Sequence, residues 1–225
     1  MRRRALLAGA ALLLAAGALA IARFRSRDES ALSAYGEARL VALEAQLAQA
    51  RAPYRLILGD SQAERLYLPE LCGAPVVNAG IGGARAAGVR RVAEALAPPV
   101  PAEAVVVMVG INDVQRRREP AEPARRAAFR EDLRAILAAG ARRAAAVYAT
   151  PLPPLDPARA PAFDAREAAS YSAIVAEECA RAGCRLADIF PADARRSPDG
   201  VHLATEAMTG ADGVAARLAR AVCRP

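Results

Sequence analysis

The sequence predicts an α/β domain in which helices cover both faces of a parallel sheet, giving three layers (α/β/α). Short apolar segments alternate along the chain with longer segments of helical periodicity, which is typical of β-α units. The short segments are mostly apolar instead of alternating regularly with polar residues, as in strands that are buried on both faces of a sheet. An apolar content of 54% over 225 residues is enough for a substantial core.

The expected elements follow in a regular order. The apolar segments predict strands over residues 54–58, 75–77, 104–109, 144–149 and 184–189. The periodic segments predict helices over residues 84–97, 122–139, 163–182 and 204–222. Crossovers between parallel strands are almost always right-handed, so this order predicts one sheet with helices on both faces.

An N-terminal apolar helix is expected before this domain. Residues 5–22 are uninterrupted Ala, Leu, Gly and Ile, and arginines flank them on both sides, so residues 1–27 are expected to be a signal peptide or a membrane anchor. Eighteen apolar residues exceed the usual signal-peptide core and reach the lower limit for a spanning helix. This length favours an uncleaved anchor with the domain outside the cytoplasm. Cleavage near Ala20, giving a secreted or periplasmic protein, is the alternative.

A further helix is expected over residues 30–50 of the segment 28–52, which precedes the α/β domain at 53–225. Leu40, Leu43 and Leu47 recur at intervals of three and four residues, and the pattern stops at Pro53. This segment is interpreted as a helical stalk or as a helix packed against the domain.

The charge and the cysteines bear on partners and compartment. Six arginines within residues 1–27 account for all but one unit of the net charge of +7, so the remaining chain offers no electrostatic basis for nucleic-acid binding. Four cysteines permit two disulfides in an oxidising compartment, with three possible pairings. Cys179 and Cys184 are close enough for a local bridge; buried free thiols are the alternative.

Polar motifs follow four of the expected strands. They are Gly59-Asp60-Ser61, Asn78-Ala79-Gly80-Ile81-Gly82-Gly83, Gly110-Ile111-Asn112-Asp113 and Asp199-Gly200-Val201-His202. Ligands of open α/β sheets bind outside the carboxyl ends of the strands, so these motifs are expected to meet at one edge. His202 is the single histidine of the chain and therefore the only possible imidazole base.

These four blocks resemble the SGNH, or GDSL-type, hydrolase family over about residues 53–222. The resemblance implies a flavodoxin-like, five-stranded parallel sheet and ester or acyl-transfer chemistry without a metal or another cofactor. A single histidine and the absence of a Cys/His cluster with zinc spacing agree with the expectation of no metal.

The resemblance also implies roles for single residues. Ser61 matches the nucleophile, His202 the general base, and Asp199 the residue that orients the imidazole. The oxyanion hole would be formed by the Ser61 N–H, the Gly83 N–H and the Asn112 side-chain amide. In the family pattern the glycine donor ends Asn-x-x-x-x-Gly, which favours Gly83, while Gly80 and Gly82 allow the tight turn. Asp60 is assigned to loop support, and Asp113 is assigned a structural role.

Two segments depart from the family pattern. Arg85 follows the second motif where family members often have an acid or a hydroxyl; it is expected either at the substrate rim, favouring an anionic or polar acyl group, or in solvent. A proline-rich loop over residues 151–161 follows the fourth strand and is the expected specificity element.

The expected function is that of a serine esterase, membrane-tethered or secreted, which hydrolyses carboxylic esters through an acyl-serine intermediate. Its expected partners are a small-molecule, lipid or carbohydrate ester and, through the N-terminal segment, a membrane. Two alternatives stay open: an O-acyltransferase acting on envelope carbohydrate, and a non-catalytic binding module on the same fold.

Overall fold

The computed structural model describes residues 32–51, 53–116, 122–191 and 198–223. The expected apolar helix at residues 5–22 lies outside these ranges, so the choice between signal peptide and anchor stays a prediction. Of the helices within these ranges, none combines the length and the apolar composition that crossing a membrane requires.

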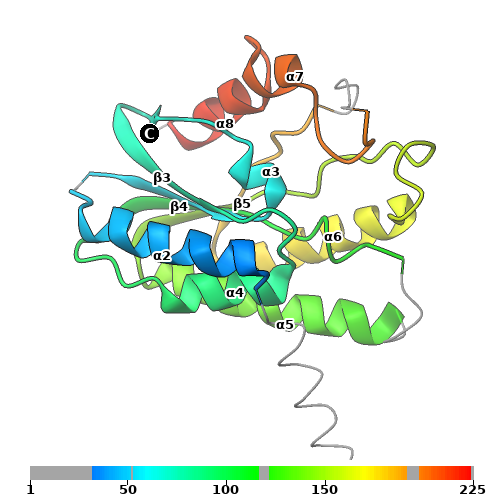
Figure 1. The fold of residues 1–225 in the computed structure, drawn as a ribbon, viewed down its shortest axis with the longest axis horizontal. Helices are drawn as coiled ribbons and strands as arrows, with labels where there is room; N and C mark the ends of the chain where they lie inside the picture. Colours follow the sequence, from blue (N-terminus) through cyan, green and yellow to red (C-terminus); the bar gives the residue numbers. More distant parts are fainter. Residues whose placement is uncertain (1–31, 52, 117–121, 192–197, 224–225) are drawn as a thin grey trace, which may run out of the picture. The chain divides into compact units, whose positions relative to one another are not determined.

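One sheet forms the middle layer (Figure 1). Its six strands lie in the order β2-β3-β1-β4-β5-β6. Five strands are parallel, and their order is the flavodoxin-like one expected from the family resemblance. The sixth, β2, was not expected, because a two-residue strand carries no pattern; it pairs antiparallel with β3 at the edge. The strands are β1 (Arg55–Gly59), β2 (Glu70–Leu71), β3 (Ala74–Gly80), β4 (Ala102–Met108), β5 (Ala144–Ala149) and β6 (Arg185–Leu186).

Helices cover both faces of this sheet, which confirms the three-layer prediction. Four helices, α2, α4, α5 and α6, pack on one face, and α3, α7 and α8 pack on the other (Figure 1). The helices are α2 (Ala34–Ala48), α3 (Ser61–Glu64), α4 (Ala86–Ala95), α5 (Glu122–Ala141), α6 (Ala165–Ala182), α7 (Thr205–Thr209) and α8 (Val214–Val222).

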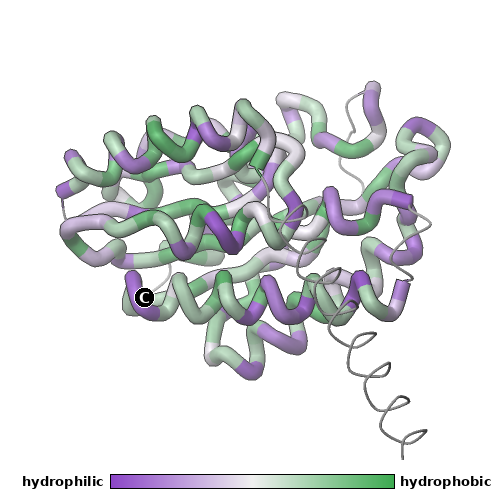
Figure 2. The backbone as a smooth tube through the Cα atoms, turned by 60° about the horizontal axis from the view of Figure 1, so that its bottom comes forward, coloured by the Kyte–Doolittle hydropathy of each residue, from purple (hydrophilic) through white to green (hydrophobic). Residues whose placement is uncertain are grey.

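The strands supply side chains to two separate cores. In β1, Leu56 and Leu58 belong to the core beneath α2, α4, α5 and α6, whereas Ile57 belongs to the core beneath α3, α7 and α8. All three are buried, as the apolar composition of the strand predicts. The helices alternate hydrophobic and hydrophilic residues along their length, as one-sided packing requires (Figure 2).

The C-terminal part differs from the prediction of one closing helix over residues 204–222. The helix is interrupted between α7 and α8, where Gly210 and Gly213 both have extended backbone. Glycine is unfavourable inside a helix, and two glycines three residues apart explain the interruption.

Two disulfides are present, one joining Cys179 to Cys184 and one joining Cys72 to Cys223. The local bridge between Cys179 and Cys184 was expected, and it links the end of α6 to the approach to β6. The second bridge ties the end of α8 to the turn between β2 and β3. The pairing of the remaining two cysteines thus fixes the C-terminal helix to the edge of the sheet.

The strand register brings the predicted motifs to one edge. Gly59 of β1 pairs with Gly80 of β3 on one side and with Met108 of β4 on the other. The three strands therefore end at the same level, and the residues that follow them emerge side by side.

Candidate active site

Ser61 is the first residue of α3, directly after β1. The preceding Asp60 caps this helix, because one carboxylate oxygen accepts a hydrogen bond from the Gln62 N–H at 2.9 Å. The other oxygen accepts from the N–H groups of Gly110 and Ile111, at 3.2 and 3.4 Å. Burial raises the pKa of Asp60 to about 7, although these three backbone donors act in the opposite direction. Asp60 thus fixes the Ser61 turn to the loop after β4.

His202 lies between Ser61 and Asp199. Its Nε2 atom is 2.8 Å from the Ser61 Oγ atom, and its Nδ1 atom is 2.7 Å from the Asp199 Oδ2 atom. The other oxygen of Asp199 accepts hydrogen bonds from the N–H groups of Val201 and His202, both at 2.9 Å. The structure therefore brings together the three residues expected to form a triad, and Asp199 also shapes the turn that carries the imidazole.

Gln62 is a site residue that the sequence analysis did not single out. Its side chain is buried, and its Nε2 atom donates a hydrogen bond to the Val201 carbonyl at 3.1 Å. This bond joins the helix that begins with Ser61 to the residue before His202. The sequence feature that could have identified Gln62 is a polar residue directly after Ser61, at a position that faces the core.

Asn112 lies in the loop after β4, and its side chain is buried beside the β3–α4 loop. Its Nδ2 atom donates to the Ala84 carbonyl at 2.9 Å, which uses one of the two amide hydrogens. The neighbouring Asp113 accepts a hydrogen bond from the Ala86 N–H at 3.0 Å and thereby caps α4. The N-cap residue of this helix, Arg85, makes no capping hydrogen bond with its own side chain. Burial raises the pKa of Asp113 to about 8. Two adjacent residues thus hold the loops after β3 and β4 together.

The glycines after β3 differ in the availability of their N–H groups. The Gly80 N–H donates to the Asn78 side-chain oxygen at 2.9 Å, so it is already engaged. Gly83 has a φ of 75°, in the region that favours glycine, and its N–H makes no hydrogen bond to another residue in the described ranges. On this geometry Gly83 is better suited than Gly80 to donate to a ligand.

Residues from two helices brace the end of β3. The Asn78 amide donates to the carbonyls of Ala63 and Leu66, which ties β3 to α3. From α2, the Arg39 guanidinium donates to the Asn78 carbonyl at 2.8 Å and to the Gly80 carbonyl at 3.5 Å. The segment that leads to Gly83 is therefore held from both sides.

A cavity of about 320 Å³ opens over this constellation. It is lined by Ser61, Asn112, Asp199, Val201 and His202 together with residues 159–163. The proline-rich loop after β5 thus borders the cavity together with the two residues that follow it. Arg85 is not among the lining residues; it is half-buried at the start of α4, where its charge acts on Asp113.

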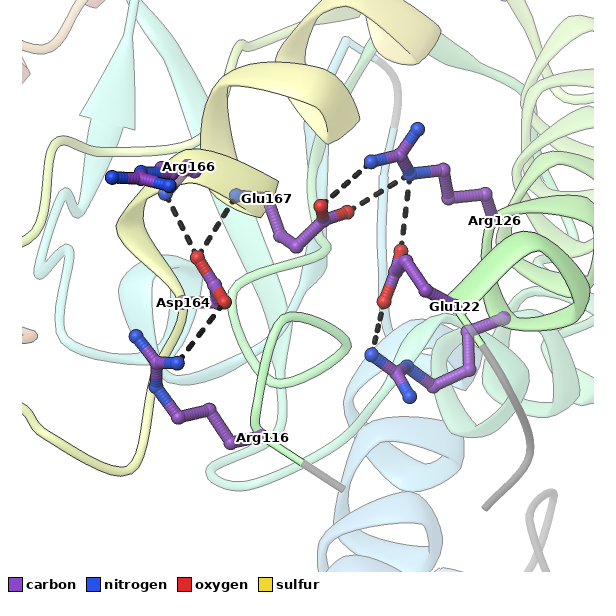
Figure 3. A network of polar contacts seen from close by, with 7 residues as sticks. Arg116, Glu122, Arg126, Asp164, Arg166 and Glu167 are labelled. Carbon is purple, nitrogen blue, oxygen red and sulfur yellow. Dashed lines mark hydrogen bonds and ion pairs between the residues drawn. The ribbon is translucent and has the colours of Figure 1, made fainter. Parts of the chain in front are cut away.

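Polar contacts fix the far end of the loop that lines the cavity. Asp164 caps α6 through the N–H groups of Arg166 and Glu167 and pairs with Arg116 at 3.3 Å (Figure 3). The backbone adds two bonds, from Arg116 to Ala162 and from Asp164 to Val114. The loop wall is therefore tied to the segment that carries Asn112.

The sequence model of the GDSL-like lipase/acylhydrolase family matches residues 45–208, nearly three-quarters of the chain. The chain belongs to the GDSL-like lipase/acylhydrolase family. The protein is accordingly a GDSL-type ester hydrolase, as the resemblance of the four motifs predicted. Among curated proteins, none matches the chain.

Solved structures with the same fold include a lipase/acylhydrolase and an acetylxylan esterase. A lipase/acylhydrolase from Enterococcus faecalis is 20% identical, with a TM-score of 0.59 over 75% of this chain and 94% of the other. An acetylxylan esterase from Geobacillus stearothermophilus is 18% identical, with a TM-score of 0.53 over 77% and 94%. A structure from Streptococcus pneumoniae has a TM-score of 0.65 at 18% identity, over 90% and 97%. At these identities the likeness concerns the fold.

Proposed function

We propose that this GDSL hydrolase cleaves carboxylic esters through an acyl-serine intermediate, with Ser61 as nucleophile, His202 as general base and Asp199 as its orienting partner. The observation that carries the proposal is the continuous chain of contacts from Ser61 Oγ through both ring nitrogens of His202 to Asp199, at 2.8 and 2.7 Å. A nucleophile within hydrogen-bond distance of a base that a third group orients is the geometry of such a site.

In the first half-reaction the Ser61 oxygen forms a bond to the ester carbonyl carbon while its proton passes to the Nε2 atom of His202. The bond from that carbon to the alcohol oxygen then breaks, and the alcohol oxygen takes the proton from Nε2. In the second half-reaction a water molecule attacks the acyl-serine in the same way, which releases the acid and restores Ser61. Asp199 stabilises the imidazolium formed in each half-reaction.

The negative charge on the carbonyl oxygen would be stabilised by the N–H groups of Ser61 and Gly83 and by the second amide hydrogen of Asn112. Two hydrogen bonds support this assignment. The Gly80 N–H is already bonded to Asn78, and the bond from the Asn112 amide to the Ala84 carbonyl places that amide beside the residue that follows Gly83. Loss of one such donor lowers turnover by about 10²–10³-fold in comparable sites.

The substrate is proposed to be a small ester, with acetyl esters of carbohydrates as one candidate class. A cavity of about 320 Å³ is at the lower end of ligand sites. The structural neighbour from Geobacillus stearothermophilus is an acetylxylan esterase. Export is proposed as well, because disulfides such as the two in this chain persist in oxidising compartments.

A fluorophosphonate probe tests the nucleophile. The full chain should be labelled, Ser61→Ala and His202→Ala should not, and Ser170→Ala, a half-buried serine of α6, should react like the wild type. An unlabelled wild type would overturn the proposed nucleophile. With 4-nitrophenyl acetate, turnover in water supports hydrolysis, whereas turnover only after a sugar acceptor is added would replace hydrolysis by acyl transfer.

A further inference from the structure

One cation lines the cavity of the proposed site, and neither the motifs nor the reaction above uses it. Arg159 belongs to the loop after β5, and among the lining residues that the structure describes it is the single arginine or lysine. The rest of that wall, Ala160 to Phe163, is uncharged. Among the described residues of the cavity, a substrate would therefore meet a positive charge at Arg159.

The position of Arg159 is fixed by packing against the loop that carries His202. The Asp156 N–H donates to the Gly200 carbonyl at 2.9 Å, and the N–H groups of Arg159 and Ala160 donate to the Asp156 carbonyl. A Cβ atom added to Gly200 would lie 2.7 Å from the Cβ atom of Arg159, so the two loops touch there. Arg159 thus contacts Gly200, which precedes the proposed base His202 by two positions in the sequence.

The guanidinium of Arg159 stays accessible although it makes an ion pair with Asp156. Asp156 pairs with it at 3.5 Å, three residues away in sequence, and the Arg159 side chain is 57% exposed. Exposed pairs of this kind contribute little energy and can be exchanged for another anion. Asp156 is not among the described lining residues, and the carboxylate that does line the cavity, Asp199, lies 2.7 Å from the His202 ring.

The side of the substrate that meets Arg159 follows from the proposed chemistry. His202 returns its proton to the leaving alcohol oxygen, so the alcohol part lies on the side of the His202 loop. We infer that Arg159 recognises an anionic group, such as a carboxylate or a phosphate, on the alcohol part of the ester; this inference rests on the proposed function. The preferred substrate class is therefore a small acyl ester of an acidic alcohol.

Two acetate esters test this preference, 4-nitrophenyl acetate and 3-carboxy-4-nitrophenyl acetate. We expect Arg159→Gln to lower the ratio of kcat/KM for the carboxylated ester to that for the neutral ester by roughly 3–10-fold, and 0.5 M salt to reduce the wild-type ratio. Arg142→Gln is the matched control. Arg142 is an exposed arginine just before β5, at the amino ends of the parallel strands, whereas the proposed site lies at their carboxyl ends. Intrinsic differences in ester reactivity cancel in the comparison of wild type with variant.

A binding measurement separates this inference from the proposed reaction. In Ser61→Ala protein, calorimetry with 5-hydroxy-2-nitrobenzoate, the carboxylated alcohol product, should show roughly 3–10-fold weaker binding when Arg159→Gln is added. Equal binding, or an unchanged kcat/KM ratio in active enzyme, would overturn the role of Arg159 while leaving the triad in place. In 4-nitrophenyl succinate the extra carboxylate lies on the acyl part, and 4-nitrophenyl pentanoate is its uncharged counterpart. If Arg159→Gln removes a preference for the succinate but changes no preference for the carboxylated alcohol, the proposed role of Arg159 is also overturned. Absence of hydrolysis of every ester would instead overturn the proposed function.

Discussion

Asp199→Asn is predicted to impair catalysis more than Asp199→Ala, although asparagine preserves the turn around His202. One oxygen of Asp199 accepts two backbone N–H groups, from Val201 and His202, while the other faces His202 Nδ1. In the asparagine variant the amide oxygen is expected to stay with the two backbone donors. The amide NH₂ must then face Nδ1, which places the ring proton on Nε2, where it can no longer accept the proton of Ser61.

The magnitude follows from the two backbone bonds. The productive tautomer of His202 carries its proton on Nδ1, and restoring it would require the side-chain amide of the Asp199→Asn variant to turn over. That rotation would break both hydrogen bonds from the backbone and set an NH₂ group against two N–H donors, at a cost of about 2–4 kcal/mol. Each 1.36 kcal/mol corresponds to a factor of about ten in rate, so kcat should fall roughly 30- to 1,000-fold. Alanine at this position leaves Nδ1 free to carry its proton toward water, because the Asp199 side chain is 47% exposed.

The assay is steady-state hydrolysis of 4-nitrophenyl acetate by wild type, Asp199→Asn and Asp199→Ala, with thermal unfolding of each. The expected order of kcat is wild type, then alanine, then asparagine, whereas the expected order of stability places asparagine above alanine. A kcat for Asp199→Asn within threefold of wild type, or above that of Asp199→Ala, would refute the reasoning about the tautomer.

Three other predictions concern the surrounding structure. Gln62→Met should lower the free energy of unfolding by about 1–3 kcal/mol in urea titrations and should also lower kcat, because the buried Val201 carbonyl loses its donor. Replacing both Cys72 and Cys223 by serine should cost about 5 kcal/mol in the same titration, since the bridge closes a loop with a sequence separation of 151; a loss below about 1 kcal/mol would contradict this. The raised pKa of Asp113, about 8 against an ordinary 3.8, means that the folded protein keeps a proton that the unfolded chain releases. The free energy of unfolding should therefore fall as pH rises from about 4 to 8, and Asp113→Asn should reduce that slope by up to about 1.4 kcal/mol per pH unit.

The parts of the fold that follow a repeating pattern could be predicted from the sequence. The parallel strands β1, β3, β4 and β5 are mostly apolar, and burial of β1 and of most of β4 leaves few polar interruptions in them. Strand β2 has two residues, one exposed and one buried, and such a segment has no period to detect. The interruption between α7 and α8 was missed because the apolar spacing of residues 204–222 outweighed Gly210 and Gly213 in the interpretation.

Contacts between distant loops at the site could not be predicted in the same way. The four motifs identify which side chains meet, because parallel strands end at one edge. The bond from Gln62 to Val201 spans 139 positions and depends on how two loops approach each other. Likewise, the proline-rich loop was expected to border the site, but the selection of Arg159 within it depends on the contact with Gly200. Sequence patterns thus locate the chemistry, while the shape around it arises from packing.

Helix α2 shows how a segment outside the family motifs can still determine the geometry of the site. The family match begins at residue 45, yet Arg39 lies before that point and holds the carbonyls of Asn78 and Gly80. Gly36 lies against Ile81, since an added Cβ atom would come 3.3 Å from the Ile81 side chain. Both contacts fall on the segment that leads to Gly83, the proposed oxyanion donor. The placement of that donor therefore depends on a helix whose sequence carries none of the chemistry.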